Sequence, residues 1–302
     1  MGLLFLMLRD ISFEIKGLNT VVYGGFIVDY SIISNEILTI SGNEVGSTSI
    51  ILAGVHGDEK CGVDVLEETL KSVCIEAGTV MYGYGNPEAI KANKRFTEAN
   101  LNRMFYDGNC DDETKKTYEY RRSDFLKMHL KKADALLDIH ASTTEQSFPF
   151  VICEPNGFDV VKFLPVSEIV SGFDYVEPGG TDYFMNSINK IGICIECGYQ
   201  ADPNSHEVAR LAILAFLKAK GHIKNDIIPN KQNYRNMFYK HYAKSDSFTL
   251  HKNFADFEIL QQGDIIGIDG DITVYSPSEC FILFAKNGTQ VNDEVFLLGN
   301  IV

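Results

Sequence analysis

The chain has 302 residues, enough for one large domain or two unequal ones. Hydrophobic residues make up 45% of the chain and charged residues 23%, so the composition is that of a folded globular protein and excludes a disordered chain. Aspartate and glutamate outnumber lysine and arginine by 41 to 27, and the formal charge of −14 argues against nucleic acid or an anionic membrane as a partner.

Seven cysteines are scattered along the chain, and this odd number predicts reduced thiols in the cytoplasm rather than a disulfide framework. The apolar run Leu3–Leu8 has no basic stretch before it and stops at Arg9 and Asp10, so we do not expect a signal peptide. No apolar stretch approaches roughly 18 residues, so we expect neither a transmembrane helix nor a membrane partner. The sequence leaves open whether the chain forms a homo-oligomer.

Up to about residue 224, short apolar runs alternate with longer helical patterns. Strands are predicted at residues 49–55, 79–84, 135–139, 148–153 and 191–195. Helices are predicted after residue 60, over residues 118–132, and from Pro203, with Asp202 as the cap, to Gly221. This alternation predicts an α/β sheet that helices cover on both faces.

After about residue 225 the pattern changes to short apolar runs without a convincing helix. Two tight hairpins are predicted, one at Asp269-Gly270-Asp271 and one at Asn287-Gly288. We therefore divide the chain into a large α/β domain at residues 1–224 and a small antiparallel β domain at residues 225–302.

Two histidines stand where predicted strands end. His56 lies in the Gly-rich segment after the first of these strands, and Glu59 follows it at the start of a helix. His140 ends another strand, and Asp138 precedes it on the same strand face, where it could orient a ligand. Ligands gather beyond the carboxyl ends of strands in such sheets, and a catalytic zinc site takes three nitrogen or oxygen ligands and leaves a fourth position for water.

Each of these motifs alone has a plainer interpretation, namely a helix-capping acid beside a surface histidine, or a hydrogen-bonded histidine at a strand end. Because the two strand ends occur together, we favour a site for one zinc ion per chain, with His56, Glu59 and His140 as ligands.

Glu196 ends a further buried strand, where a carboxylate is costly unless it meets a cation or a metal-bound water. It could serve as general base and then as general acid, and the alternative is a solvated carboxylate at a strand end. Cys194 and Cys197 flank it, but residues three apart on a strand point to opposite faces, so we expect neither a zinc site nor a redox pair there.

Two of the chain's seven arginines, Arg95 and Arg103, lie in one short polar loop. Arginine suits both a carboxylate and a developing oxyanion. In a chain this acidic, a local basic pair is what an anionic substrate needs, although a surface loop with incidental charges remains the alternative.

Taken together and in this order, the motifs resemble the succinylglutamate desuccinylase/aspartoacylase family, whose fold is related to that of the zinc carboxypeptidases. The matching segments are Gly54–Glu59, Asn86–Ala89, Arg95–Phe105, Asp138–His140 and Glu196–Gly198. The resemblance implies a mixed sheet flanked by helices, with a small C-terminal antiparallel β domain.

The resemblance also implies roles for individual residues. His56, Glu59 and His140 would bind zinc, and Glu196 would be the catalytic carboxylate. Arg95 would polarise the scissile carbonyl, while Asn102 and Arg103 would hold the substrate's carboxylate.

Two departures from the family pattern bear on the substrate. Asn186 stands where aspartoacylases carry a substrate-binding arginine, which predicts a substrate less anionic than N-acetylaspartate. Asn100 stands where the family has an aspartate. For the tyrosine that aspartoacylases bring from the β domain, the sequence offers Tyr275 and Phe284 without deciding between them.

These inferences lead to a zinc-dependent amidohydrolase that cleaves the N-acyl amide of an N-acyl amino acid or similar small carboxylate. The first alternative is a metallocarboxypeptidase that acts on a peptide or peptidoglycan fragment. The second is a zinc-binding regulatory or structural protein without turnover. Glu196 argues against the latter, because a structural zinc site closes its fourth position with a protein ligand.

Overall fold

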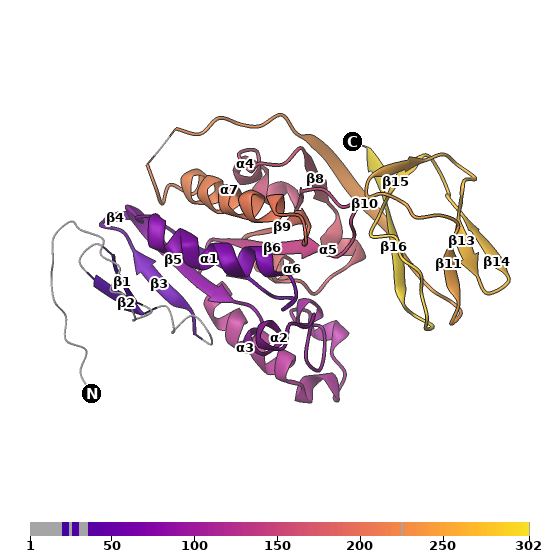
Figure 1. The fold of residues 1–302 in the computed structure, drawn as a ribbon, viewed down its shortest axis with the longest axis horizontal. Coiled ribbons are helices and arrows are strands. Elements are labelled where there is room, and N and C mark those ends of the chain that lie inside the picture. The colour runs from indigo at the N-terminus through magenta and orange to yellow at the C-terminus, as the bar shows by residue number, and fades with distance from the viewer. Residues whose placement is uncertain (1–19, 24–25, 30–35, 225, 302) are drawn as a thin grey trace.

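The computed structural model describes residues 20–23, 26–29, 36–224 and 226–301 (Figure 1). The run Leu3–Leu8, considered above as a signal peptide, lies outside these residues. The strands are β1 (Thr20–Tyr23), β2 (Phe26–Asp29), β3 (Leu38–Ser41), β4 (Glu44–Ala53), β5 (Ala77–Tyr84), β6 (Ala135–Ser142), β7 (Phe150–Cys153), β8 (Glu168–Ser171), β9 (Ile191–Tyr199), β10 (Asn233–Tyr242), β11 (Phe248–Leu250), β12 (Glu258–Leu260), β13 (Ile265–Asp269), β14 (Ile272–Tyr275), β15 (Cys280–Leu283) and β16 (Glu294–Ile301). The helices are α1 (Lys60–Ser72), α2 (Pro87–Ala92), α3 (Tyr118–Leu130), α4 (Phe158–Val161), α5 (Phe173–Val176), α6 (Thr181–Ser187) and α7 (Asn204–Ala219).

One mixed sheet of eleven strands runs through the molecule in the order β12-β15-β16-β10-β8-β7-β9-β6-β4-β5-β3. Its centre is parallel, because β4 pairs with β5 and β6, and β6 pairs with β9, in the same direction. The pairing of β7 with β9 is antiparallel, as are those at both ends of the sheet. Most of β6 and β9 and the C-terminal half of β4 are buried, as their continuous apolar runs predict.

Helices cover both faces of this sheet. On one face, α1, α4 and α7 pack on alternate side chains of β4, β6 and β9. On the other face, α3 and α6 pack on the intervening side chains, and α5 packs on β7 and β8. The mixed α/β fold with flanking helices is therefore confirmed.

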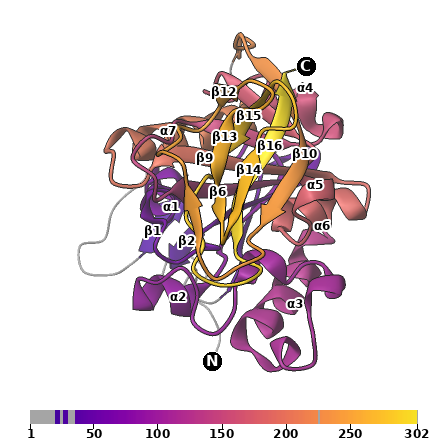
Figure 2. The ribbon, with the colours of Figure 1, turned by 90° about the vertical axis from the view of Figure 1, so that its right-hand side faces the viewer.

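The C-terminal strands extend this sheet instead of starting a separate one. β10 pairs with β8 in parallel on one side and with β16 in antiparallel on the other. Figures 1 and 2 show β10 and β16 leading from the central strands into a C-terminal lobe, which we define as residues 233–301. A small antiparallel sheet, β11-β13-β14, completes this lobe. The division at residue 225 stays a prediction, because the sheet is continuous across it.

Two local expectations are refined. Asp202 Oδ1 accepts a hydrogen bond from the backbone N–H of Asn204 at 2.9 Å, and α7 begins at Asn204. The hairpin at residues 269–271 is confirmed, since β13 pairs with β14. At the second predicted hairpin, β15 pairs with β16 in antiparallel as expected, but residues 284–293 connect the two strands, so the tight turn at Asn287-Gly288 is wrong. Gly288 forms a bridge to Phe248, and a Cβ at residue 288 would lie 2.8 Å from a methyl carbon of Val295. The glycine is needed there for close packing.

All seven cysteines lie in the described part of the chain, and none forms a disulfide. Cys194 and Cys197 pack in different clusters on opposite faces of β9, as expected from their spacing. Within the described residues, no helix is long and apolar enough to cross a membrane.

Candidate active site

The turn between β4 and α1 brings His56 and Glu59 together. Gly54 at the start of the turn has φ +67°, a left-handed conformation that favours glycine. At Gly57, a Cβ would lie 2.1 Å from a backbone carbon of Ala89, so only glycine fits. The turn therefore packs tightly on α2 and directs both functional side chains to the carboxyl end of the parallel strands.

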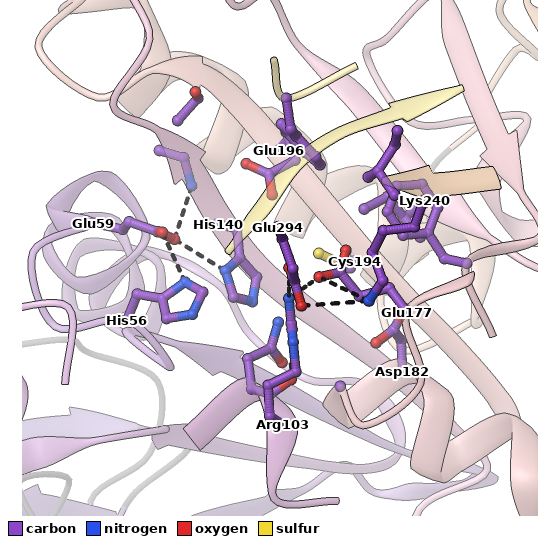
Figure 3. A pocket seen from close by; sticks show the side chains of 18 of the residues that line it. His56, Glu59, Arg103, His140, Glu177, Asp182, Cys194, Glu196, Lys240 and Glu294 are labelled. Carbon is purple, nitrogen blue, oxygen red and sulfur yellow. Dashed lines mark hydrogen bonds and ion pairs between the residues drawn. The ribbon is translucent and has the colours of Figure 1, made fainter. Parts of the chain in front are cut away.

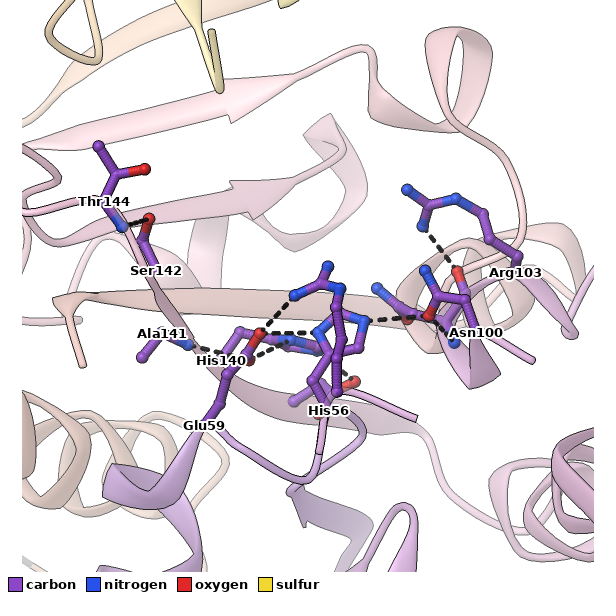
Figure 4. A network of polar contacts seen from close by, with 11 residues as sticks. His56, Glu59, Asn100, Arg103, His140, Ala141, Ser142 and Thr144 are labelled. Atoms are coloured by element: carbon purple, nitrogen blue, oxygen red, sulfur yellow. Dashed lines mark hydrogen bonds and ion pairs between the residues drawn. The ribbon is translucent and has the colours of Figure 1, made fainter. Parts of the chain in front are cut away.

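Glu59 lies at the centre of a buried polar cluster (Figure 4). Its Oε1 lies 2.8 Å from His56 Nδ1, and its Oε2 lies 3.0 Å from His140 Nδ1. The backbone N–H of Ala141 donates to Oε2 at 3.1 Å, and Arg95 Nη1 donates to Oε1 at 3.1 Å. The residues His56, Glu59 and His140 are each only 2–3% exposed, and one possible ligand atom from each lies within 4.8 Å of the others.

Both imidazoles face an acceptor with their other nitrogen. His56 Nε2 lies 3.1 Å from Asn100 Oδ1, and His140 Nε2 lies 3.2 Å from Asp138 Oδ2. In the tautomer that carries its proton on Nε2, each neutral imidazole would direct the Nδ1 lone pair at Glu59. Two nitrogen lone pairs and a carboxylate that converge in this way repel one another unless a cation lies between them. This donor set therefore fits a divalent metal ion with oriented imidazole ligands.

Burial and the close contact of the three charged or polar side chains also shift the pKa values of His56, Glu59 and His140. Burial lowers the pKa of His56. Burial would also lower the pKa of His140, but the charges of Asp138 and Glu59 outweigh it and raise that pKa well above its usual value. Burial would raise the pKa of Glu59, but the two histidines hold it well below its usual range. The cluster thus favours a carboxylate that faces a positive charge.

Glu196 lies next to this cluster through the strand register. It is the direct partner of His140 between the adjacent parallel strands β6 and β9, so the two side chains emerge on the same face of the sheet. Burial and the nearby charge of Glu59 raise the pKa of Glu196 to about 8. Figure 3 shows its carboxylate above His140, at the same cavity.

A buried carboxylate holds the loop that carries Arg95. Glu119, on α3, is fully buried and accepts hydrogen bonds from the backbone N–H and the hydroxyl of Thr97, at 2.7 and 2.6 Å. The backbone N–H of Ala99 and the side chain of Asn86 donate to the same carboxylate. This network fixes the loop between Arg95, which is 47% exposed, and Asn100.

The candidate ligands line a cavity of about 360 Å³, a size that suits a small organic molecule. Arg95, Asn102, Arg103 and Glu196 line it as well. The C-terminal lobe supplies one part of the wall with Lys240, Phe284, Ala285, Lys286, Glu294, Phe296 and Leu297. Phe284, with a left-handed φ of 54°, lines the cavity, whereas Tyr275 does not line it and is 55% exposed.

Arg103 is already engaged by carboxylates of its own chain. Its Nη2 donates to Glu177 and, at 3.3 Å, to Glu294 Oε2. Lys240 Nζ lies 3.3 Å from Glu294 Oε1 and 3.9 Å from Glu177 Oε1. Burial raises the pKa of Glu177 to about 7, while the pKa of Glu294, which burial alone would raise, is held at about 2 by Glu177, Arg103 and Lys240. These four residues, here called the Arg103–Lys240 cluster, join the loops that carry Arg103 and Glu177 to the C-terminal lobe.

Asn186 differs from the other predicted site residues, because it does not line the cavity. It lies on α6, its Oδ1 accepts from the backbone N–H of Gly192 at 3.1 Å, and its Nδ2 donates to Asp174 Oδ1 at 3.3 Å. Asp174 does line the cavity. Asn186 therefore lies one residue behind the cavity wall.

Sequence and structure comparisons identify relatives of this fold and site. The model of the succinylglutamate desuccinylase/aspartoacylase catalytic domain matches residues 45–219, more than half of the chain. The chain belongs to the succinylglutamate desuccinylase/aspartoacylase family. All eight predicted site residues lie inside the matched range, whereas the seven C-terminal residues of the cavity wall lie beyond it.

Among curated members of this family, a probable aspartoacylase of Nostoc sp. is 25% identical over 169 residues, which are 52% of this chain and 56% of that protein. The succinylglutamate desuccinylase of Pseudomonas aeruginosa is 32% identical over 74 residues, 23% of this chain and 22% of that protein. This chain thus matches about half the length of the first relative and about a fifth of the second. The crystal structure of succinylglutamate desuccinylase from Vibrio cholerae shares the fold, with a TM-score of 0.76 at 17% identity over 88% of this chain and 85% of that chain.

The family pattern did not point to six charged residues of the cavity: Asp174, Glu177, Asp182, Lys240, Lys286 and Glu294. Glu177 precedes Pro178 and two glycines, which marks only a loop. Lys240 and Glu294 are 54 positions apart in the sequence and lie on the paired strands β10 and β16, so no local motif predicts that they meet at the cavity.

Proposed function

We propose that the chain is a zinc-dependent deacylase that hydrolyses the amide bond of a small N-acylated amino acid or similar carboxylate. The observation that carries this proposal is the cluster of three buried donors, His56, Glu59 and His140, beside the carboxylate of Glu196 in one cavity. An amide hydrolase needs an electrophilic centre, a proton carrier and a substrate pocket, and this cavity offers residues for all three.

One zinc ion per chain would be held by His56 Nδ1, a Glu59 oxygen and His140 Nδ1, with Asn100 and Asp138 orienting the imidazoles. When bound, such an ion supplies Lewis acidity and makes water acidic enough to attack an amide near neutral pH. Three protein donors leave a position for water, which is the arrangement of a catalytic site and not of a structural one.

Glu196 takes the proton of the attacking water and returns it to the leaving nitrogen. Burial raises the pKa of Glu196, which brings its protonation closer to neutral pH, as this exchange needs. Arg95, which reaches Glu59 Oε1 at 3.1 Å, stabilises the negative charge that develops on the carbonyl oxygen.

Asn102 and Arg103 orient the substrate's carboxylate, and both line the cavity. A bound carboxylate would share Arg103 with Glu177 and Glu294, so the affinity for that group depends on the Arg103–Lys240 cluster. Asn186 bears on specificity because its side chain is neutral. Its amide contacts Asp174, where an arginine would introduce a positive charge.

The C-terminal lobe bears on the alternative of a metallocarboxypeptidase. Seven of its residues line the cavity, and a covered cavity of about 360 Å³ favours a small substrate over a peptide chain. The position of Glu196 beside the donors supports an enzyme over a zinc protein without turnover. For the compartment we propose the cytoplasm, which suits seven free thiols.

The test is hydrolysis by metal-free and zinc-loaded protein of N-acetyl, N-succinyl and N-formyl amino acids. We expect free amine to be released by the zinc-loaded protein and restored activity when zinc is returned to the metal-free protein. Turnover of a peptide but of no N-acyl amino acid would replace the deacylase with the peptidase. Absence of turnover on every substrate would overturn the proposal of an enzyme.

A further inference from the structure

The cations of the cavity wall are largely used within the protein. Arg95 pairs with Glu59, and Arg103 and Lys240 share Glu177 and Glu294. Among the described residues that line the cavity, this leaves Lys286 as the cation without a carboxylate partner, and its side chain is exposed. The wall thus presents few free positive charges to a substrate.

Two carboxylates of the same wall have the opposite property. No lysine, arginine or histidine of the described chain lies within ion-pair distance of Asp174 or Asp182, although both are partly buried. Burial and the charge of Asp182 raise the pKa of Asp174 to about 7. Burial and the charge of Asp138 raise the pKa of Asp182 to about 6. A cation beside these groups would relieve both effects.

An independent observation concerns Asn102. Its Oδ1 atom is buried and accepts no hydrogen bond from the described residues, and its side chain lines the cavity. A buried acceptor without a donor is costly, so it indicates a ligand with an N–H or O–H group.

Two of these acceptors lie close together beside Gly180. A Cβ on Gly180 would lie 2.3 Å from Asp182 Oδ1 and 3.3 Å from Asn102 Oδ1, so the two oxygens lie at most 5.6 Å apart. Gly180, Asn102 and Asp182 all line the cavity. One donor nitrogen between the two oxygens can therefore reach both. Figure 3 shows Asp182 beyond Arg103 and Glu177, on the side of the cavity away from His56 and Glu59.

We propose that the substrate carries an ammonium group on its amine part, which Asp182, Asp174 and Asn102 Oδ1 bind. The inference rests on the proposed deacylase function and names its substrate class: N-acylated diamino compounds, in particular an N-acyl diamino acid. An ammonium group has three N–H donors, which match three acceptors from three separate segments. Because Asp182 lies on the side of the cavity away from His56 and Glu59, the ammonium group belongs at the end of the substrate remote from the scissile amide.

Asn186 fits this assignment. Its amide donates to Asp174 at 3.3 Å and leaves that carboxylate its negative charge. An arginine at position 186 would neutralise Asp174 from behind the wall and compete with a substrate ammonium group. The neutral residue at this position is thus part of the same specificity.

The first test measures binding of a deacylation product and needs no turnover. Ornithine and norvaline have the same carbon chain and differ in the terminal ammonium group. Calorimetry on zinc-loaded protein should give a Kd at least about tenfold lower for ornithine. Asp182→Asn should abolish this difference, and Asp174→Asn should reduce it. The control is Asp159→Asn, which alters a carboxylate whose side chain is 96% exposed, on α4, and should leave the difference unchanged.

Equal affinity for ornithine and norvaline would overturn the inference, and so would a preference for ornithine that both variants retain. If the melting curve shows that Asp182→Asn does not fold, Asp174→Asn alone decides whether the ammonium site exists. Asp174 lies on α5, away from Gly180, which precedes α6.

The second test measures hydrolysis of Nα-acetylornithine and N-acetylnorvaline. We expect a kcat/KM ratio of at least about ten in favour of the ornithine derivative, which Asp182→Asn should lower towards one. A ratio near one in the wild type would overturn the inference while the deacylase proposal stands. If neither compound is hydrolysed, the deacylase proposal fails, and the product-binding comparison still decides whether the ammonium site exists.

Discussion

Replacement of Glu196 by glutamine separates a catalytic from a structural role of this side chain. The substitution keeps the size of the side chain and removes the group that carries the proton. If Glu196 is the proton carrier, kcat should fall by about 10²- to 10⁴-fold, which corresponds to ~3–5 kcal/mol of activation free energy. The zinc content should stay near that of the wild type, because the three candidate ligands are His56, Glu59 and His140.

The stability of the same variant can be worked out from the structure. The pKa of Glu196 is raised from an ordinary 4.5 to about 8, first by burial and then by the charge of Glu59. For an acid whose folded pKa is raised, the folded state binds more protons above pH 4.5, so stability falls as pH rises from there to about 8. At pH 7 this costs the metal-free protein about 3 kcal/mol, and glutamine avoids the cost.

Metal-free Glu196→Gln should therefore be more stable than the metal-free wild type at pH 7, by up to that amount, and the gain should be smaller at pH 5. Urea denaturation at the two pH values, zinc analysis and kcat on the zinc-loaded protein together complete the test. A variant with near-normal kcat and a loss of stability at pH 7 would refute the reasoning, because that is the behaviour of a carboxylate with a purely structural role.

Three further predictions concern the surroundings of Glu196. His56→Ala and His140→Ala should each lose most of the bound zinc in elemental analysis, whereas full retention in both would refute the ligand assignment. Arg103→Ala should lower the free energy of unfolding by about 2–4 kcal/mol, because it leaves buried Glu177 with a weaker partner. Adding Glu294→Gln to this variant should recover part of the loss. Additive effects of the two substitutions in denaturation curves would contradict the coupling between Arg103 and Glu294. Glu119→Gln should cost about 1–3 kcal/mol at pH 7, since its Nε2 would face backbone N–H groups. Burial would raise the pKa of Glu119, but the Thr97 hydrogen bonds hold it below 4.5. The stabilisation by the Glu119 carboxylate is therefore present above that pH and lost as pH falls further. A stability difference between Glu119→Gln and the wild type that is as large at pH 3 as at pH 7 would refute this account.

The sequence predicts the centre of the fold because the signals there are local. The buried strands are continuous apolar runs, and the turn between β4 and α1 needs glycine at positions 54 and 57. The strand-end histidines follow from the same pattern, since parallel strands end at one edge of the sheet and bring His56 and His140 together.

The residues that bear on specificity escaped prediction for two physical reasons. Asp174 and Asp182 stand on helices of four and seven residues, which are too short for a periodic pattern. Lys240 and Glu294 depend on pairing between distant strands, which no local pattern specifies. The prediction of a tight turn at Asn287-Gly288 was wrong because this glycine is required for close packing against Val295 and not for a turn.

The continuous sheet makes the alignment of β10 with β16 part of the binding site. Lys240 pairs with Leu297, and Glu294 pairs with Tyr242, with one register shift between the two pairs. A slip of β16 by one residue would turn Glu294 away from the cavity, because neighbouring strand residues face opposite sides. An insertion or deletion in residues 284–293, which join β15 to β16, would thus change the charge of the pocket without altering any residue that lines the metal side. Related chains with the same catalytic segments could acquire different substrates through the length of this one connection.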